Sequence, residues 1–309
     1  RLWTATSASG MALYDEHSDQ FRIIKTESWM PHGIPSVIVT SLFQDREGKI
    51  WGTTRKGAFF FDPDNNLFES VIPGNKAGAD EYMLSARACV ETADGKWWLG
   101  TGNGLFYLDP LSGSTRYYGN EPGKPKVLQD NSVRSLFIDA GGDLWIGTSK
   151  GVNVLRAGSS KMEFLSDKDG LPNVVTKAIH QSRDGTIWVA NFSPSGHCYR
   201  LPGEKIFHPL SEHPVLAHYA GSFGQCILED SRGRLWFGLD GNGLTYYDPA
   251  NRIAKYWKRT PANDSTLIGN FVYSMTEDAR GRIWAATLEG ISVIDPITFH
   301  FTNYNTATG

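Results

Sequence analysis

Six positions in this chain, each eleven residues before a recurring tryptophan, include side chains that could bind an anion. Three successive positions carry cations, and the full set is Thr40, Arg87, Arg134, Lys177, Gln225 and Tyr273. A guanidinium can hold a carboxylate or sulfate through two parallel hydrogen bonds. Arg55, Lys56 and Lys150 follow the same tryptophans by a few residues and could add to this positive field. The alternative is that each cation pairs with a nearby acid or carbonyl and has only a structural role.

A second set of candidate binding residues is aromatic or lies beside an aromatic residue. Trp29 occurs in Ser-Trp-Met-Pro-His-Gly, which also supplies His32. Tyr82, His218 and Tyr219 lie in comparable loop-like segments. Aromatic rings at a pocket mouth can stack on the apolar face of a sugar. The alternative for Trp29 is a ring that folds inward and anchors its loop.

The other residues with catalytic or metal-binding chemistry are poorly arranged for it. His208, His213 and His218 are spaced by five residues, unlike the compact ligand spacing of zinc motifs. The glycine-rich residues 100–104 are followed by no helix pattern whose N-terminus could hold a phosphate. We therefore expect no metal, no cofactor and no catalytic residue in this chain. The enzymatic alternative is a lyase that uses a His and a Glu for proton abstraction.

The recurring tryptophan is the element that organises the chain. It occurs at intervals of 43 to 48 residues, at Trp3, Trp51, Trp98, Trp145, Trp188, Trp236 and Trp284. Each follows an apolar residue, so we interpret these rings as packing residues between modules rather than as ligand-binding groups. A repeat of about 40 to 50 residues built from short strands is typical of a β-propeller.

The fourth module shows how one repeat is expected to fold. Residues 132–139 form a β-rich apolar run, and Gly141-Gly142 makes a tight turn. Residues 144–148, 151–155 and 161–165 supply three further strands. The phrase Asp-x-x-Gly-x-x-Trp is similar to the Asp-box of sialidases, but here it joins the first strand to the second in most modules. We therefore assign it a turn role.

The predicted fold is all-β: a seven-bladed β-propeller of four-stranded antiparallel blades, forming a single domain over residues 1–309. The blades are expected at residues 1–27, 36–71, 84–118, 131–165, 173–210, 222–257 and 270–304. Residue 1 aligns with the start of a second strand, so the first blade lacks its innermost strand in this chain. We expect a longer parent protein to supply that strand, from before Arg1 or after Gly309.

The composition excludes some classes of protein. The net charge of −3 does not suggest a nucleic-acid binder, whose usual mark is a strongly basic face. No stretch approaches the about 18 apolar residues of a membrane span, and no secretion signal is visible. Cys89, Cys198 and Cys226 all lie in predicted strands. We interpret these cysteines as buried packing residues rather than a disulfide framework.

Two segments resemble a known family. Residues 131–152, which contain Gly-Asp-Leu-Trp-Ile-Gly-Thr, and residues 94–110, which contain Lys-Trp-Trp-Leu-Gly-Thr-Gly, resemble the two-component regulator propeller repeat. The resemblance recurs in all seven modules and is weakest at residues 186–201. It implies a periplasmic sensor region of a bacterial hybrid two-component sensor or of a membrane-bound cyclic-dinucleotide enzyme, often controlling glycan use. The signalling domain would lie outside this chain.

We therefore expect an extracytoplasmic ligand-recognition propeller of a signal-transduction protein, with an oligosaccharide as its ligand. The loops between blades and the loops from second to third strand share one face of a propeller, where ligands usually bind. The expected binding residues there are Trp29, His32, Arg55, Tyr82, Arg87, Arg134, Lys150, Lys177, Tyr219 and Tyr273. A protein-interaction scaffold is the first alternative, and a propeller lyase or glycoside-active enzyme is the second.

The expected partners are that oligosaccharide or another small ligand, and the adjoining propeller, linker and signalling domains of the parent chain. A homodimer formed through the parent protein is a further expectation, and no nucleic acid is expected. The identity of the ligand and the type of output domain stay open at this point.

Overall fold

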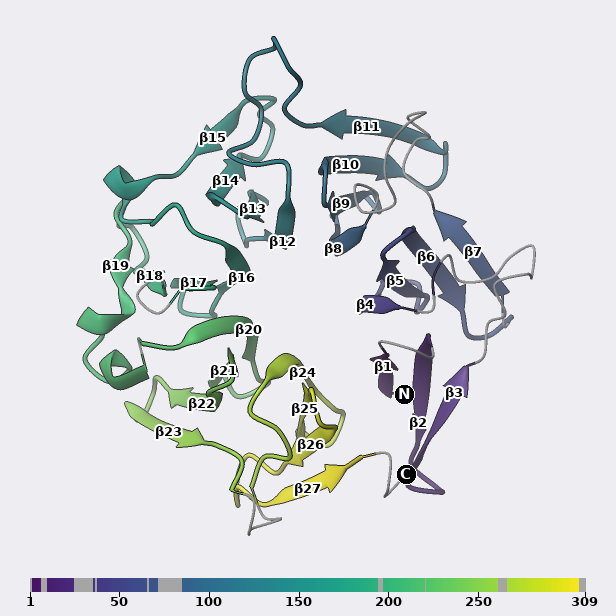
Figure 1. Ribbon diagram of the computed structural model, residues 1–309, viewed down its shortest axis with the longest axis vertical. Coiled ribbons are helices and arrows are strands. Elements are labelled where there is room, and N and C mark those ends of the chain that lie inside the picture. The colour runs from purple at the N-terminus through teal and green to yellow at the C-terminus, as the bar shows by residue number, and fades with distance from the viewer. Residues whose placement is uncertain are drawn as a thin grey trace. The chain divides into compact units, whose positions relative to one another are not determined.

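The computed structural model, shown in Figure 1, describes residues 2–6, 10–24, 36, 38–65, 67–71, 85–193, 197–219, 221–260 and 266–305. It confirms the predicted fold class, a seven-bladed β-propeller of four-stranded antiparallel sheets whose first sheet has three strands. Three 3₁₀ helices connect strands: η1 (Asp167–Asp169), η2 (Leu210–Glu212) and η3 (Ala217–Tyr219). None of the helices among these residues is long and apolar enough to cross a membrane.

The strands follow the repeat in order, and each sheet pairs its strands in sequence. The first sheet contains β1 (Leu2–Ala5), β2 (Met11–Asp15) and β3 (Gln20–Ile24). The second contains β4 (Val39–Gln44), β5 (Ile50–Thr54), β6 (Gly57–Asp62) and β7 (Leu67–Val71). The third contains β8 (Ala86–Glu91), β9 (Trp97–Thr101), β10 (Gly104–Asp109) and β11 (Ser114–Tyr118).

The fourth sheet contains β12 (Val133–Ile138), β13 (Leu144–Thr148), β14 (Gly151–Leu155) and β15 (Met162–Phe164), as the sequence of that module predicted. The fifth contains β16 (Thr176–Gln181), β17 (Ile187–Asn191), β18 (Cys198–Arg200) and β19 (His208–Pro209). The sixth contains β20 (Phe223–Glu229), β21 (Leu235–Asp240), β22 (Gly243–Asp248) and β23 (Ile253–Trp257). The seventh contains β24 (Val272–Glu277), β25 (Ile283–Thr287), β26 (Ile291–Ile294) and β27 (Phe301–Tyr304).

The chain divides into two compact units. Unit 1 comprises residues 1–138, 142–149 and 155–162, and unit 2 comprises residues 139–141, 150–154 and 163–309. Within unit 2 the first strands of successive sheets, β16, β20 and β24, lie side by side (Figure 1). Within unit 1 the same holds for β4, β8 and β12.

The buried clusters combine side chains from consecutive sheets. In unit 2, Trp236 and Leu244 of the sixth sheet pack with Ile283 and Ile294 of the seventh. In unit 1, Trp51 of the second sheet stacks on Trp97 of the third, with ring centroids 4.2 Å apart. The recurring tryptophans are buried from Trp51 to Trp284, and Trp3 is half-buried. Their packing role is therefore confirmed.

A buried indole must also satisfy its N–H group, and for four of the recurring tryptophans the turn between first and second strands supplies the acceptor. Trp236 donates to Asp230 Oδ2 at 3.0 Å, while Asp230 Oδ1 accepts from the backbone N–H groups of Arg232 and Arg234. Asp45 and Asp278 hold Trp51 and Trp284 in the same way. In the fifth sheet Ser182 replaces the aspartate and accepts from Trp188. The Asp-box-like phrase thus has the turn role that the sequence predicted.

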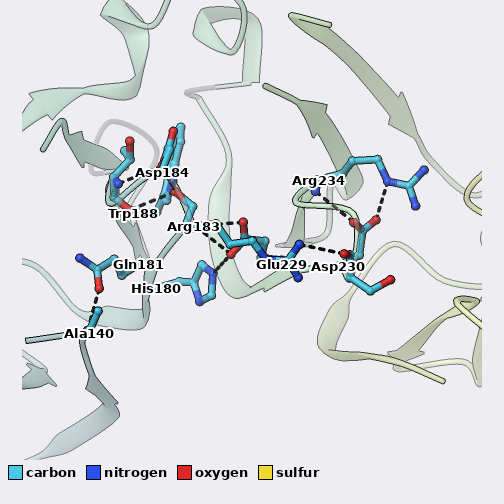
Figure 2. A network of polar contacts seen from close by, with 12 residues as sticks. Ala140, His180, Gln181, Arg183, Asp184, Trp188, Glu229, Asp230 and Arg234 are labelled. Atoms are coloured by element: carbon cyan, nitrogen blue, oxygen red, sulfur yellow. Dashed lines mark hydrogen bonds and ion pairs between the residues drawn. The ribbon is translucent and has the colours of Figure 1, made fainter. Parts of the chain in front are cut away.

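The same turns connect neighbouring sheets within unit 2 (Figure 2). The backbone N–H of Arg183 in the fifth sheet donates to Glu229 Oε1 at the end of β20, at 3.0 Å. Ser231 in the sixth sheet donates to Glu277 at the end of β24 through its backbone N–H and through its hydroxyl, both at 2.6 Å. We call these contacts the inter-sheet latches. Both lie at the turn between the first and second strands, one in the fifth sheet and one in the sixth.

The cysteines behave as predicted for packing residues. Cys89, Cys198 and Cys226 are free thiols in β8, β18 and β20. Burial raises the pKa of each thiol to about 12, so all three stay protonated at neutral pH.

Truncating a buried tryptophan should strongly destabilise the protein. For Trp236→Ala we expect the free energy of unfolding to fall by about 3–5 kcal/mol, because a large cavity forms between sheets. Trp236→Phe keeps the ring but removes the donor to Asp230, so a smaller loss of about 1–3 kcal/mol is expected. Chemical denaturation followed by circular dichroism measures both. Equal losses for the two variants would contradict the role assigned to the indole N–H.

Removing an inter-sheet latch should destabilise less. For Glu277→Ala we expect a loss of about 1–3 kcal/mol, because two hydrogen bonds to Ser231 disappear. The exposed Glu69 on β7 offers a matched control, and Glu69→Ala should change stability by less than about 0.5 kcal/mol. Similar effects of the two substitutions would mean that the latch contributes nothing.

Candidate functional site

The six aligned positions of the sequence analysis are all β-bulge residues. In every four-stranded sheet, the register between first and second strand shifts at that position. In the fourth sheet, for example, Val133 pairs with Thr148 and Ser135 pairs with Gly147, so the register shifts at Arg134. A bulge redirects a side chain without ending the strand. We call Thr40, Arg87, Arg134, Lys177, Gln225 and Tyr273 the bulge residues.

Each bulge residue lies near the start of its first strand, at the end of the sheet where the second strand turns into the third. The residue that opens this turn follows the bulge residue by fifteen positions. In three successive sheets the two side chains are in contact: Arg134 with Ser149, Lys177 with Phe192, and Gln225 with Asp240. We call the residue fifteen positions after each bulge residue its turn partner.

In unit 1 the bulge residues are polar or cationic. Thr40 Oγ1 lies 3.0 Å from the carbonyl oxygen of Ala86 and ties the second sheet to the third. Arg134 donates from Nε to Ser149 Oγ at 2.9 Å. The turn partner of Arg87 is Gly102, which has no side chain, and Arg87 donates instead to Ser132 Oγ at 2.7 Å. Each of the two arginines therefore donates a hydrogen bond to a serine hydroxyl.

In unit 2 the bulge residues are joined by aromatic and acidic neighbours. The Lys177 ammonium lies 5.1 Å from the centroid of the Phe192 ring, which is 39% exposed. The rings of Phe192 and Phe223 are 4.9 Å apart. Gln225 donates from its amide to the Asp240 carboxylate. This end of the unit thus combines an exposed ring, a cation and an amide–carboxylate pair.

Tyr273 is the most exposed of these aromatic side chains, at 47%, and its turn partner Leu288 is 64% exposed. Burial raises the pKa of the Tyr273 hydroxyl, and the charges of Asp240 and Glu289 raise it further. The hydroxyl therefore stays protonated at neutral pH and can donate a hydrogen bond. An exposed phenol with an apolar neighbour suits stacking against a ligand ring.

The other residues predicted for the site have mixed outcomes. Arg55 and Lys150 are exposed in the turns between β5 and β6 and between β13 and β14, as predicted. Tyr219 lies in η3 with its ring 5.6 Å from Tyr256, packed against the cluster that contains Trp188. This packing supports an anchoring role for Tyr219. Trp29, His32 and Tyr82 lie outside the described residues.

The three regularly spaced histidines have separate environments. His208 lies 2.9 Å from Glu204, whereas His213 is buried and its Nδ1 accepts from the backbone N–H of Leu216. His218 lies in η3. Across the part of the chain that the structure describes, no three His, Cys, Asp or Glu side chains are grouped to hold a metal ion.

His197 is a residue that sequence reasoning missed, and it packs beneath the bulge of the sixth sheet. Its Nδ1 accepts from the backbone N–H of Asn191 at 3.1 Å. A Cβ atom at Gly224 would come within 2.5 Å of the His197 ring, so only glycine fits directly before the bulge residue Gln225. The ring therefore helps to fix the backbone that carries Gln225. Since a lone histidine is unremarkable in sequence, only the structure shows this contact.

The family comparison matches three modules. The two-component regulator propeller model matches residues 127–150, 221–241 and 266–289, which include Arg134, Gln225 and Tyr273. This confirms the resemblance seen in the sequence. Among curated proteins, none matches the chain.

Several solved structures share the fold. The extracellular domain of a hybrid two-component system of B. thetaiotaomicron is 22% identical, with a TM-score of 0.54, over 98% of this chain and 39% of that chain. A second such domain from B. thetaiotaomicron is 18% identical, with a TM-score of 0.51, over 99% and 56%. Virginiamycin B lyase from Staphylococcus aureus is 14% identical, with a TM-score of 0.64, over 91% and 86%. The chain thus spans about half or less of the two sensor domains that it resembles.

The buried His197 predicts a loss of stability in mild acid. Burial lowers its pKa from 6.5 to about 4, and a backbone contact with Ser222 opposes this only weakly. Between these values the unfolded chain binds a proton that the folded chain does not, so the free energy of unfolding falls as pH is lowered through this window. The difference in pKa corresponds to at most about 3 kcal/mol.

This effect is measured from denaturation curves at several pH values between 7.5 and 4. His197→Gln should show a shallower loss of stability with falling pH than the unsubstituted protein. The exposed His17 provides the control, and His17→Gln should leave the slope unchanged. An unchanged slope in His197→Gln would exclude His197 as its source.

Proposed function

We propose that this chain is an extracytoplasmic ligand-recognition propeller of a bacterial signal-transduction protein and that it binds an oligosaccharide through the bulge residues and their turn partners. The observation that carries this proposal is the repeated bulge. It places five different residue types at the same position of six sheets without changing the ladder around it. Within each unit, such side chains on successive sheets are suited to contacting successive groups of an extended ligand.

The chemistry of the pairs supports an oligosaccharide. The exposed rings of Phe192 and Tyr273 can stack on the apolar faces of sugars, and the Gln225–Asp240 pair can exchange hydrogen bonds with hydroxyl groups. Arg87 and Arg134 can bind a carboxylate or sulfate substituent. The two-component regulator propeller match, which includes Arg134, Gln225 and Tyr273, supports a sensory role.

A sensory role also needs a preference between states. Ligand binding can transmit a signal only if one arrangement of the propeller relative to its neighbours binds more tightly than another. We propose that the adjoining domains and a second protomer of the parent protein provide these alternative arrangements.

The same geometry argues for binding rather than catalysis. A lyase mechanism needs a base and an acid that both reach the ligand. In unit 2, His208 lies beside Glu204, and His180 lies 3.3 Å from Glu229 at the ends of β16 and β20 that carry the inter-sheet latches. Glu229 is there engaged by the Arg183 backbone (Figure 2). The similarity to virginiamycin B lyase is one of fold.

The proposal is tested by calorimetric titration with neutral and acidic oligosaccharides at low and high salt. We expect saturable binding that Tyr273→Ala weakens by about three- to tenfold, since one aromatic contact is worth about 0.5–1.5 kcal/mol. The control is Leu111→Ala, because Leu111 is 98% exposed in the turn between β10 and β11. Equal affinity of the two variants would place the site elsewhere, and absence of binding by folded protein would favour the scaffold alternative.

The dependence of affinity on salt concentration measures the contribution of the arginines separately. If Arg134 binds an acidic group, affinity for acidic oligosaccharides should fall as salt screens the charges, and Arg134→Gln should reduce that dependence. Affinity for neutral oligosaccharides should be insensitive to salt in both proteins. Acidic ligands whose binding is independent of salt would contradict an anion-binding role for Arg134.

A further inference from the structure

A small cavity lies between the fifth and sixth sheets of unit 2. Its walls come from β17 and β18 of the fifth sheet and from β20, β21 and β22 of the sixth. Most of the lining is apolar and includes Trp188, Leu216 and Phe237. The cavity volume is about 20 Å³. That is enough for one water molecule when polar partners are present.

Among the side chains that line this cavity, two have a buried polar atom without a hydrogen-bond partner among the described residues, one from each sheet. They are His197, directly before β18, and Thr245 on β22. His197 is 7% exposed and Thr245 is 1% exposed. The Ser222 backbone lies close enough to the His197 ring to affect its pKa, but neither His197 Nε2 nor Thr245 Oγ1 makes a hydrogen bond of good geometry among the described residues. Buried polar atoms of this kind normally bind a protein group or an ordered water.

The tautomer of His197 defines the hydrogen bond that its free nitrogen can make. Nδ1 accepts from the Asn191 backbone N–H, and the lowered pKa keeps the imidazole neutral at pH 7. The proton of the neutral ring is therefore on Nε2, which is a donor. A threonine hydroxyl can donate or accept. The cavity thus contains one donor and one adaptable group.

We propose that this cavity is a binding site for one water molecule, which accepts a hydrogen bond from His197 Nε2 and exchanges a second one with Thr245 Oγ1. The water joins the fifth sheet to the sixth. Since the His197 ring packs on Gly224, directly before the bulge residue Gln225, the bridge also stabilises the backbone beneath one pair of the candidate site. This proposal is independent of the ligand that the bulge residues bind.

The sign of one substitution separates a hydrated cavity from a dry one. With the water present, Thr245→Val removes a bridging hydrogen bond, so the Tm should fall by about 2 °C. In a dry cavity the same substitution replaces an unsatisfied hydroxyl by a methyl group and should raise the Tm. Thr101→Val is the reference, because Thr101 is also buried and its hydroxyl donates to the Gly104 carbonyl. A Tm that rises in Thr245→Val overturns the proposal.

A crystal structure at high resolution provides the second measurement. We expect a water within hydrogen-bond distance of both His197 Nε2 and Thr245 Oγ1 in the unsubstituted protein, and its loss or displacement in Thr245→Val. No density in the cavity of the unsubstituted protein, or a water bound to neither atom, would also overturn the proposal.

Discussion

The buried indole with a polar N–H group is the constraint on which the rest of this structure depends. A ring as large as that of Trp236 packs between sheets only if its nitrogen finds an acceptor, and the turn aspartate Asp230 is that acceptor. The other oxygen of the same carboxylate closes the turn. One side chain therefore fixes both the turn and the depth of the ring. Because these two are coupled, each sheet takes up the same relation to its own turn.

The two ends of the sheets therefore differ in how far their residues can vary. At the end that carries the turn aspartates, the inter-sheet latches connect the turns of the fifth and sixth sheets to the first strand of the following sheet, as Arg183 contacts Glu229 (Figure 2). At the other end, the bulge residues and turn partners vary from sheet to sheet. Substitutions there do not break the ladder, because the bulge residue is outside it. If the proposed site is correct, stability and ligand recognition depend on opposite ends of the same strands.

The sequence predicted the features that depend on the spacing of residues along the chain. The spacing of the tryptophans predicted the sheets, and the alignment eleven residues before them found Arg134 and Gln225. It did not predict the bulge, because register is decided by backbone hydrogen bonds that spacing does not reveal. Turn partners such as Asp240 were missed for a related reason. Asp240 is fifteen residues from Gln225 and lies beside it only across the bulged ladder. Tyr219 is packed against core side chains, as loop aromatics often are.

The bulge position also tolerates many residue types in this chain. The ladder residues on either side of it are small, as Ala86 and Ala88 or Val133 and Ser135 show, whereas the residue between them ranges from threonine to arginine and tyrosine. A single chain therefore carries five residue types at one equivalent position of six sheets, each with the same local backbone. Exchange of side chains at those positions leaves the ladder unchanged, although contacts such as that of Thr40 with the Ala86 carbonyl must adjust.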